Sequence, residues 1–287
     1  MQIKLVGITS KPNKIEVREI VPPLIAWLQR RGVEVLFDKE TAVSVASGAE
    51  GLTRDELGSR VDLAIVLGGD GTFLATARAL EGRPVPILAM NLGGLGFLTV
   101  VTRDELYPAL EAVLKGSYRT ESRVQIEAEV VRNECCAASF LALNDVVLNK
   151  AAIARVLDFD VWVDGLFIST YKSDGLIVST PTGSTAYSLA AGGPVVAPSV
   201  GAFIITPICA HTLTNRPIVL SDTTTIEVAV KSEGEPAYFT VDGQVGMEVH
   251  GEDRVRIRKS TKTVEIVQPS SKNYFEVLRQ KLKWGER

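Results

Sequence analysis

A glycine-rich turn between a buried strand and a helix constrains the fold of this chain more than any other feature. The turn is Gly68-Gly69-Asp70-Gly71-Thr72. Residues 61–67 before it are apolar and β-branched except for Asp62, as expected of a strand that is buried on both faces. Apolar residues at helical spacing follow it, from Phe73 to Leu80. The pattern therefore predicts a strand–turn–helix unit of a parallel sheet.

The composition of this turn favours phosphate binding. Glycines permit positive φ and a close approach of ligand to backbone, and N–H groups at a helix N-terminus converge on phosphate oxygens. A carboxylate there would repel phosphate, so Asp70 is expected to meet a hydroxyl or a metal beside the phosphates. Leu74 stands where the dinucleotide fingerprint needs a third glycine, and no P-loop Gly-Lys-Ser/Thr occurs. A βα turn without a ligand is the plain alternative.

Residues 1–98 alternate between strand and helix patterns around this turn. Further strands are predicted near residues 1–8, 33–37 and 86–90, with a helix that ends before Gly32 and starts or kinks at its two prolines. Weak periodicity in residues 41–60 predicts a mobile loop. The alternation predicts a doubly wound parallel sheet of Rossmann-like type, with ligands at the carboxyl ends of its strands. A second glycine loop, residues 91–98, would end on the same edge.

The character changes after a short helix near residues 106–114, which a Thr102-x-x-Glu105 pattern opens. From about residue 118 to 268, short alternating runs and Asp-Gly turns at Asp164 and Asp242 predict antiparallel hairpins in a β-sandwich. Helical spacing returns in the tail, near residues 274–282. The predicted domains are an α/β domain of residues 1–98 plus 269–287, and a β-rich domain of residues 99–268.

Two polar clusters interrupt the β-rich half. Asn144-Asp145 follows Leu143 in an apolar run, where polar groups are costly unless they are satisfied or lie at the end of a strand. A bulge or an edge position is the structural alternative. Residues 174–188 run from a strand into a loop rich in hydroxyls and glycine, for which a Ser/Thr turn is the alternative.

Together these motifs resemble those of the NAD kinase family. The glycine turn alone is also similar to that of diacylglycerol kinases, sphingosine kinases and 6-phosphofructokinases. Residues 91–98 resemble the Asn-x-Gly-x-x-Gly-Phe-Leu loop of NAD kinases, and residues 174–187 resemble Asp-Gly-x-x-x-Ser-Thr-Pro-x-Gly-Ser-Thr-Ala-Tyr. The resemblance covers most of the chain. It implies transfer of the γ-phosphoryl group of ATP to the 2′-hydroxyl of the adenosine ribose of NAD, giving NADP.

The resemblance also implies roles for individual residues. Asp70 would accept the 2′-hydroxyl proton, Asn144 and Asp145 would hold the adenine and the ribose hydroxyls, and Asp174 would bind the nicotinamide amide. The remaining positions are a phosphate loop of Gly68, Gly69, Gly71 and Thr72, an adenine and ribose wall of Thr185, Ala186, Tyr187, Ser188, Leu189 and Ala190, and the polar positions Arg155, Lys172 and Gln244. As isolated charges, Arg155 and Lys172 are more typical of solvated surface groups.

Composition limits the partners and the cellular compartment that are expected for this chain. The net charge of −3 does not indicate a nucleic-acid or anionic-membrane partner, and no run approaches the roughly 18 apolar residues of a membrane span. The first residues read as a strand rather than as a signal peptide. Three cysteines without a disulfide or zinc pattern favour a reduced cytoplasm. A divalent cation, Mg²⁺ with ATP, would be the cofactor, with no metal site built from protein residues alone.

The sequence motifs leave two other functions possible, and they do not determine the oligomeric state. A lipid kinase of the diacylglycerol type would share only the turn, and it would leave Asn144-Asp145 unexplained. An NAD-binding sensor without catalytic activity would keep the same motifs, although the intact Asp70 speaks against it. The resemblance implies a homodimer or homotetramer built through the β-rich domain, with residues near Asp174 close to a neighbouring chain. It further implies that the tail helix packs back on the first domain.

Overall fold

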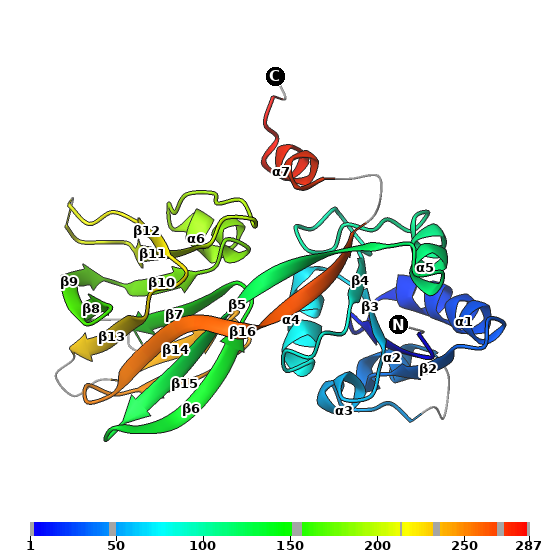
Figure 1. The fold of residues 1–287 in the computed structure, drawn as a ribbon, viewed down its shortest axis with the longest axis horizontal. Coiled ribbons are helices and arrows are strands. Elements are labelled where there is room, and N and C mark those ends of the chain that lie inside the picture. The colour runs from blue at the N-terminus through cyan, green and yellow to red at the C-terminus, as the bar shows by residue number, and fades with distance from the viewer. Residues whose placement is uncertain are drawn as a thin grey trace. The chain divides into compact units, whose positions relative to one another are not determined.

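The chain forms two compact units, Met1–Ser122 with Val264–Arg287, and Arg123–Thr263. The structure is a computed structural model, and it describes residues 3–45, 50–150, 157–212, 214–231, 236–268 and 273–285 (Figure 1). Within these residues, the predicted combination of an α/β unit, a β-rich unit and a final helix is confirmed.

The first unit is built on a parallel sheet in the order β2-β1-β3-β4, next to which the end of β16 pairs through Ile266. Its strands are β1 (Leu5–Ser10), β2 (Glu34–Phe37), β3 (Leu63–Leu67) and β4 (Ile87–Met90), with β16 spanning Arg254–Gln268. Its helices are α1 (Ile15–Gln29), α2 (Lys39–Val45), α3 (Arg54–Gly58), α4 (Asp70–Ala79), α5 (Leu106–Leu114) and α7 (Tyr274–Leu282). All five residues of β3 are buried, as the apolar run predicted.

Helix α1 begins at Ile15, ahead of the two prolines that were expected to start or kink it. Pro22 and Pro23 lie on its exposed side, where water can satisfy the carbonyl groups that lose a partner. The opposite side buries Leu24 and Leu28 in the core of the unit.

The prediction of a mobile loop at residues 41–60 is wrong for half of that range. Helices α2 and α3 cover residues 41–45 and 54–58, while residues 46–49 lie outside the described part of the chain. A capping box between Thr53 and Glu56 starts α3, and a 2.9 Å ion pair from Arg54 to the buried Asp38 anchors it. Both helices are too short to show apolar periodicity, so caps and this ion pair fix them instead.

The division between the units falls later than the predicted boundary at residue 98. Leu106, Leu110 and Val113 of α5 pack in the same apolar core as α1. Residues 99–122 therefore belong to the first unit, together with residues 264–268 at the end of β16.

The second unit consists of antiparallel strands around one apolar core. One sheet has the order β12-β11-β10-β7-β14-β15; in the other, the first part of β16 is followed by β13, β8 and β9, and β5 and β6 form a hairpin beside β16. The strands are β5 (Arg119–Arg132), β6 (Cys135–Ala142), β7 (Asp145–Lys150), β8 (Leu157–Val163), β9 (Leu166–Ser173), β10 (Gly175–Ser179), β11 (Ala202–Ile208), β12 (Ile218–Ser221), β13 (Ile226–Lys231), β14 (Ala237–Val241) and β15 (Val245–Val249). A 3-10 helix, η1 (Gly183–Thr185), and α6 (Tyr187–Ala190) follow β10.

Both predicted Asp-Gly hairpins are present. Asp164 and Gly165 have φ of 50° and 77°, and Asp242 and Gly243 have φ of 50° and 63°. Positive φ at both central residues matches the right-handed twist of the flanking strands, which explains the preference for Asp-Gly.

Candidate active site

The glycine turn lies where the strand order of the first sheet reverses. From β1 the chain moves to β2 on one side, and from β3 it moves to β4 on the other, so the carboxyl ends of β1 and β3 flank a switch point. Lys11 follows β1, and its N–H donates to Leu67 O at 2.9 Å. A side chain at Gly68 would collide with Thr72, so glycine is required at the start of the turn.

The Asp70 carboxylate ties this turn to the second glycine loop. Its Oδ1 accepts hydrogen bonds from Leu98 N–H (3.1 Å), Thr99 N–H (3.2 Å) and the Thr99 hydroxyl (3.1 Å). Its Oδ2 accepts one bond from the described residues, from Phe97 N–H at 3.0 Å. Because each carboxylate oxygen has two lone pairs, Oδ2 keeps a direction in which it can accept a further hydrogen bond.

Gly96 makes this docking possible. A Cβ at this position would overlap with Asp70 Oδ1 and with Thr99 Oγ1. By contrast, a Cβ at Gly94 in the same loop would meet no atom within 4 Å. The close approach of the two loops thus depends on one particular glycine.

A cavity of about 310 Å³ lies beside the two loops. Its walls are the turn at Gly68 and Gly69, residues 91–96, and three lysines, Lys11, Lys14 and Lys281. Among its described lining residues, Asp70 is the single carboxylate. Three ammonium groups and backbone N–H groups at the start of α4 make the cavity suited to a polyphosphate.

The second unit places Asn144 and Asp145 where β7 begins, at one end of the six-stranded sheet. The carboxylate of Asp242, in the turn between β14 and β15, accepts from the N–H groups of Leu143 (3.1 Å), Asn144 (2.7 Å) and Asp145 (3.2 Å). The polar pair therefore occupies the start of a strand, one of the positions that the sequence left open, and the hairpin turn fixes its backbone.

The side chain of Asp145 is only 4% exposed. Burial, together with the neighbouring Asp242 carboxylate, raises the pKa of its carboxyl to about 7. Directly opposite in β10, the Ser179 hydroxyl is buried with no hydrogen-bond partner among the described residues. Buried polar groups of this kind are costly unless a ligand completes their hydrogen bonds.

The wall predicted from Thr185 to Ala190 lies on the same face of this sheet. Ser188 is buried, and its hydroxyl is hydrogen-bonded to Thr206 of β11 at 2.9 Å. Thr206 shares a face with Ile204, which pairs with Ser179. The Ser188 side chain thus anchors α6 on the sheet, whereas Tyr187 is 43% exposed and available to a ligand.

Asp174 lies at the opposite end of β10 from this group. Gly175 pairs with Asn149 and Ser179 pairs with Asp145, so Asp174 and Asp145 are separated by about 17 Å of strand. At its own end, Asp174 Oδ1 lies 2.8 Å from Lys150 Nζ. The structure does not bring the predicted adenosine and nicotinamide residues together within one end of the sheet.

The other predicted polar positions are dispersed. Lys172 of β9 lies 3.6 Å from the Asp158 carboxylate, and Gln244 closes the β14–β15 turn through its N–H to Val241 O. Arg155 lies outside the described residues. No group of His, Cys, Asp and Glu in the described part of the chain is arranged to hold a metal ion. No described helix combines the length and apolarity that a membrane crossing needs.

Models of the ATP-NAD kinase N-terminal domain and C-terminal domain match residues 6–118 and 143–269. The chain belongs to the NAD kinase family. NAD kinases of Solibacter usitatus and Koribacter versatilis are each 50% identical to it, over 99% of this chain and 99% and 100% of theirs. Its activity is therefore that of an NAD kinase, which transfers the γ-phosphoryl group of ATP to the 2′-hydroxyl of the adenosine ribose of NAD.

Solved structures of NAD kinases agree with this assignment. Yeast NADH kinase complexed with NADH has a TM-score of 0.92 at 25% identity, with 100% of this chain and 89% of that chain covered. An NAD kinase from Archaeoglobus fulgidus in complex with ATP has a TM-score of 0.77 at 27% identity, with 97% and 98% covered. Because the family models match both domains, they exclude the lipid-kinase alternative, which rested on the turn alone.

Four residues at the two polar sites of this NAD kinase were not predicted from its sequence. Lys11 and Lys14 lie within four residues of the end of the first strand, so the rule that ligands bind at carboxyl ends could have indicated them. Lys281 is far away in sequence, and nothing in its neighbourhood points to a phosphate. The Asp242 carboxylate was noted only as turn chemistry, although it holds the backbone of Asn144 and Asp145.

The raised pKa of Asp145 predicts a pH-dependent cost in stability. The folded state holds the carboxyl proton to about pH 7, whereas the unfolded chain releases it near 3.8. Stability attributable to this group therefore falls as pH rises through this window. We expect Asp145→Asn to raise the free energy of unfolding by more at pH 8 than at pH 5, by a few kcal/mol. Urea unfolding at both pH values measures this, with the exposed Asp104→Asn as the control; an equal effect of Asp145→Asn at both would contradict it.

Proposed function

We propose that the two substrates bind at separate polar sites, one in each unit. The triphosphate of ATP binds in the lysine-lined cavity of the first unit, and the adenosine ribose of NAD binds at Asn144 and Asp145 of the second. The observation that carries the proposal is the cavity itself, because it combines three cations, a glycine turn and one carboxylate.

The protein forms no covalent bond to the substrates in this reaction, so most of the rate enhancement comes from positioning the reactants and stabilising charge. The 2′-hydroxyl oxygen forms a bond to the γ-phosphorus, the bond from that phosphorus to the β,γ-bridging oxygen breaks, and ADP leaves. Asp70 accepts the hydroxyl proton at Oδ2, the oxygen with one described donor. The ammonium groups of Lys11, Lys14 and Lys281 stabilise charge on the phosphate oxygens.

A divalent cation fits this site as a companion of the nucleotide. Mg²⁺ is commonly held by one or two carboxylates together with substrate phosphates and water. Because the open direction at Asp70 Oδ2 is assigned to the 2′-hydroxyl, the phosphates of ATP and water would supply the ligands of the cation. When bound, the cation neutralises charge on the transferred phosphoryl group.

The second site offers acceptors to ribose hydroxyls. A carboxyl group bonds to hydroxyls in either protonation state, and the Ser179 hydroxyl opposite Asp145 has no partner among the described residues. Tyr187 and Ala190, both exposed on α6, would contact the adenosine. The Asp242 carboxylate positions this site by fixing the backbone N–H groups of residues 143–145.

Two variants, each expected to raise the Michaelis constant for only one of the substrates, test this proposal. We expect Asp145→Ala to raise KM for NAD by more than it lowers kcat, because it removes bonds made in ground and transition states alike. Lys281→Ala should raise KM for ATP and leave KM for NAD within about twofold. Steady-state kinetics with each substrate varied in turn provide the measurement, and Lys283→Ala, on the same tail but outside the cavity lining, is the control. A rise in KM for the other substrate in either variant would contradict the proposal.

We also propose a homodimer or homotetramer that works in the reducing cytoplasm. Leu166, Phe167 and Ile168 are exposed on β9, the last strand of its sheet, and such an edge needs cover. An assembly would let Asp174, remote from Asp145 in its own chain, serve a neighbouring copy. Three free, exposed cysteines are compatible with a reducing compartment.

Dilution tests the assembly. We expect an oligomer at micromolar concentration, with specific activity that falls as dilution separates the copies. Light scattering paired with activity across the dilution series measures both quantities. A monomer with full specific activity would contradict both the assembly and the shared role of Asp174.

A further inference from the structure

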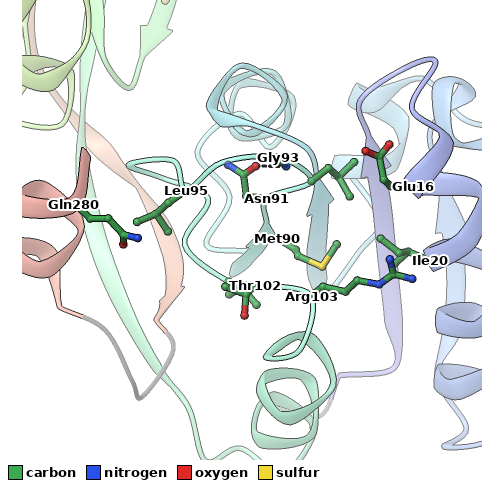
Figure 2. A pocket seen from close by; sticks show the side chains of 11 residues that line it. Glu16, Ile20, Met90, Asn91, Gly93, Leu95, Thr102, Arg103 and Gln280 are labelled. Carbon is green, nitrogen blue, oxygen red and sulfur yellow. Dashed lines mark hydrogen bonds between the residues drawn. The ribbon is translucent and has the colours of Figure 1, made fainter. Parts of the chain in front are cut away.

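A second cavity, of about 420 Å³, lies at the carboxyl end of β4 in the first unit. Figure 2 shows Glu16 and Ile20 of α1 on one side of it, and Leu95 and Gln280 on the other. The end of β4 and the following loop lie between them, and the remaining lining residues are Met90, Asn91, Leu92, Gly93, Val101, Thr102 and Arg103.

This cavity adjoins the lysine-lined one. Asn91, Leu92, Gly93 and Leu95 line both. A ligand whose phosphates lie among the lysines would therefore place its next group in the second cavity. The volume of the second cavity lies within the usual range for small-molecule sites, roughly 300–1,000 Å³.

The chemistry of the second cavity differs from that of the first. Its walls include the buried side chains of Ile20, Met90 and Val101, and its one described cation, Arg103, is paired with the Glu19 carboxylate at 3.4 Å. Such walls suit a flat, neutral group better than a phosphate. Polar groups stand among them: the Glu16 carboxylate can accept from an exocyclic amino group, and the Gln280 amide can donate and accept.

We infer that the second cavity binds the nucleoside part of the phosphoryl donor, the purine base with its ribose. The inference rests on the proposed binding of the triphosphate in the lysine-lined cavity. Helix α7 then takes part in binding both halves of the donor, with Lys281 at the phosphates and Gln280 at the nucleoside. Lys281 Nζ also lies 5.7 Å from the centre of the Phe97 ring, a cation–π contact between α7 and the second glycine loop.

Two probes separate the nucleoside cavity from the phosphate cavity in calorimetric titrations of the full chain. They are adenylyl imidodiphosphate, which carries the nucleoside, and inorganic tripolyphosphate, which lacks it. Glu16→Trp fills the nucleoside cavity from α1 and Gln280→Trp fills it from α7; neither residue lines the phosphate cavity. Ile15→Trp, exposed on α1 and outside both cavities, is the aromatic control, and Glu16→Gln removes the charge without filling space.

We expect each filling variant to weaken the analogue about tenfold or more, because the ring occupies space that the nucleoside needs. Binding of tripolyphosphate should stay within about twofold of the original, which also shows that the fold is intact. Unchanged binding of the analogue in both variants, or equal loss of both probes, would overturn the inference. Lys11→Ala examines the underlying assignment separately: it should weaken both probes, and no effect on either would refute phosphate binding in the first cavity.

Discussion

Asp70→Asn is expected to lower kcat by about 10²–10⁴ while NAD affinity stays within a few-fold, because the amide cannot take the 2′-hydroxyl proton. The substitution keeps the size of the side chain but leaves one acceptor oxygen instead of two. Steady-state turnover and direct NAD titration measure the two quantities. Near-normal turnover in this variant would contradict the catalytic role of Asp70.

The structural part of the Asp70 effect can be measured by itself. Asp70 also holds the second glycine loop, through Phe97, Leu98 and Thr99. Thr99→Val removes the hydroxyl that donates to Oδ1 at 3.1 Å and accepts from the Asn91 amide at 2.8 Å, but keeps the carboxylate. We expect this control to cost less than about tenfold in kcat, since one hydrogen bond to a charged group is worth about 1.5–3 kcal/mol at most and only part of it is specific to the transition state. A loss as large as that of Asp70→Asn would instead assign the effect to the loop.

Gly96→Ala is expected to lower kcat/KM by about 10² or more, because its methyl group would overlap with Asp70 Oδ1 and force a misplacement of the carboxylate. The same change at the exposed Gly201 of the second unit, where a Cβ would approach only the Asp222 carboxylate, at 3.2–3.3 Å, should have a much smaller effect. Kinetics and thermal unfolding of both variants provide the comparison. Equal activity of the two variants would show that the contact between Gly96 and Asp70 does not matter for catalysis.

The first half of the fold could be predicted because its signals are local. The strand before Gly68 is continuously apolar, and the following helix shows its stripe within ten residues. Helices α2 and α3 could not be read in the same way, since a helix of five to seven residues completes less than two turns. These two helices are held in place by the buried Asp38, whose ion pair with Arg54 links residues 16 positions apart in the sequence.

The site could be predicted by residue type but only partly by geometry. Motifs indicated Asp145 and Asp174, yet their separation follows from the register of β10 on β7, which no local pattern reveals. The same limit applies to Ser188: a hydroxyl in a site-like motif reads as a ligand contact, whereas its partner Thr206 shows a structural role. Lys281 reaches the phosphate cavity only because the tail belongs to the first unit.

Transfer of a labelled phosphoryl group tests the central claim most directly. Purified protein with NAD, Mg²⁺ and γ-³²P-labelled ATP should form NADP with the label at the 2′-phosphate, and the Asp70→Asn protein should form almost none. Nuclease digestion of the product followed by chromatography locates the label. NADP formation at equal rates by both proteins, or ATP consumption without labelled NADP, would contradict the assignment of Asp70 and its phosphate cavity as the catalytic site.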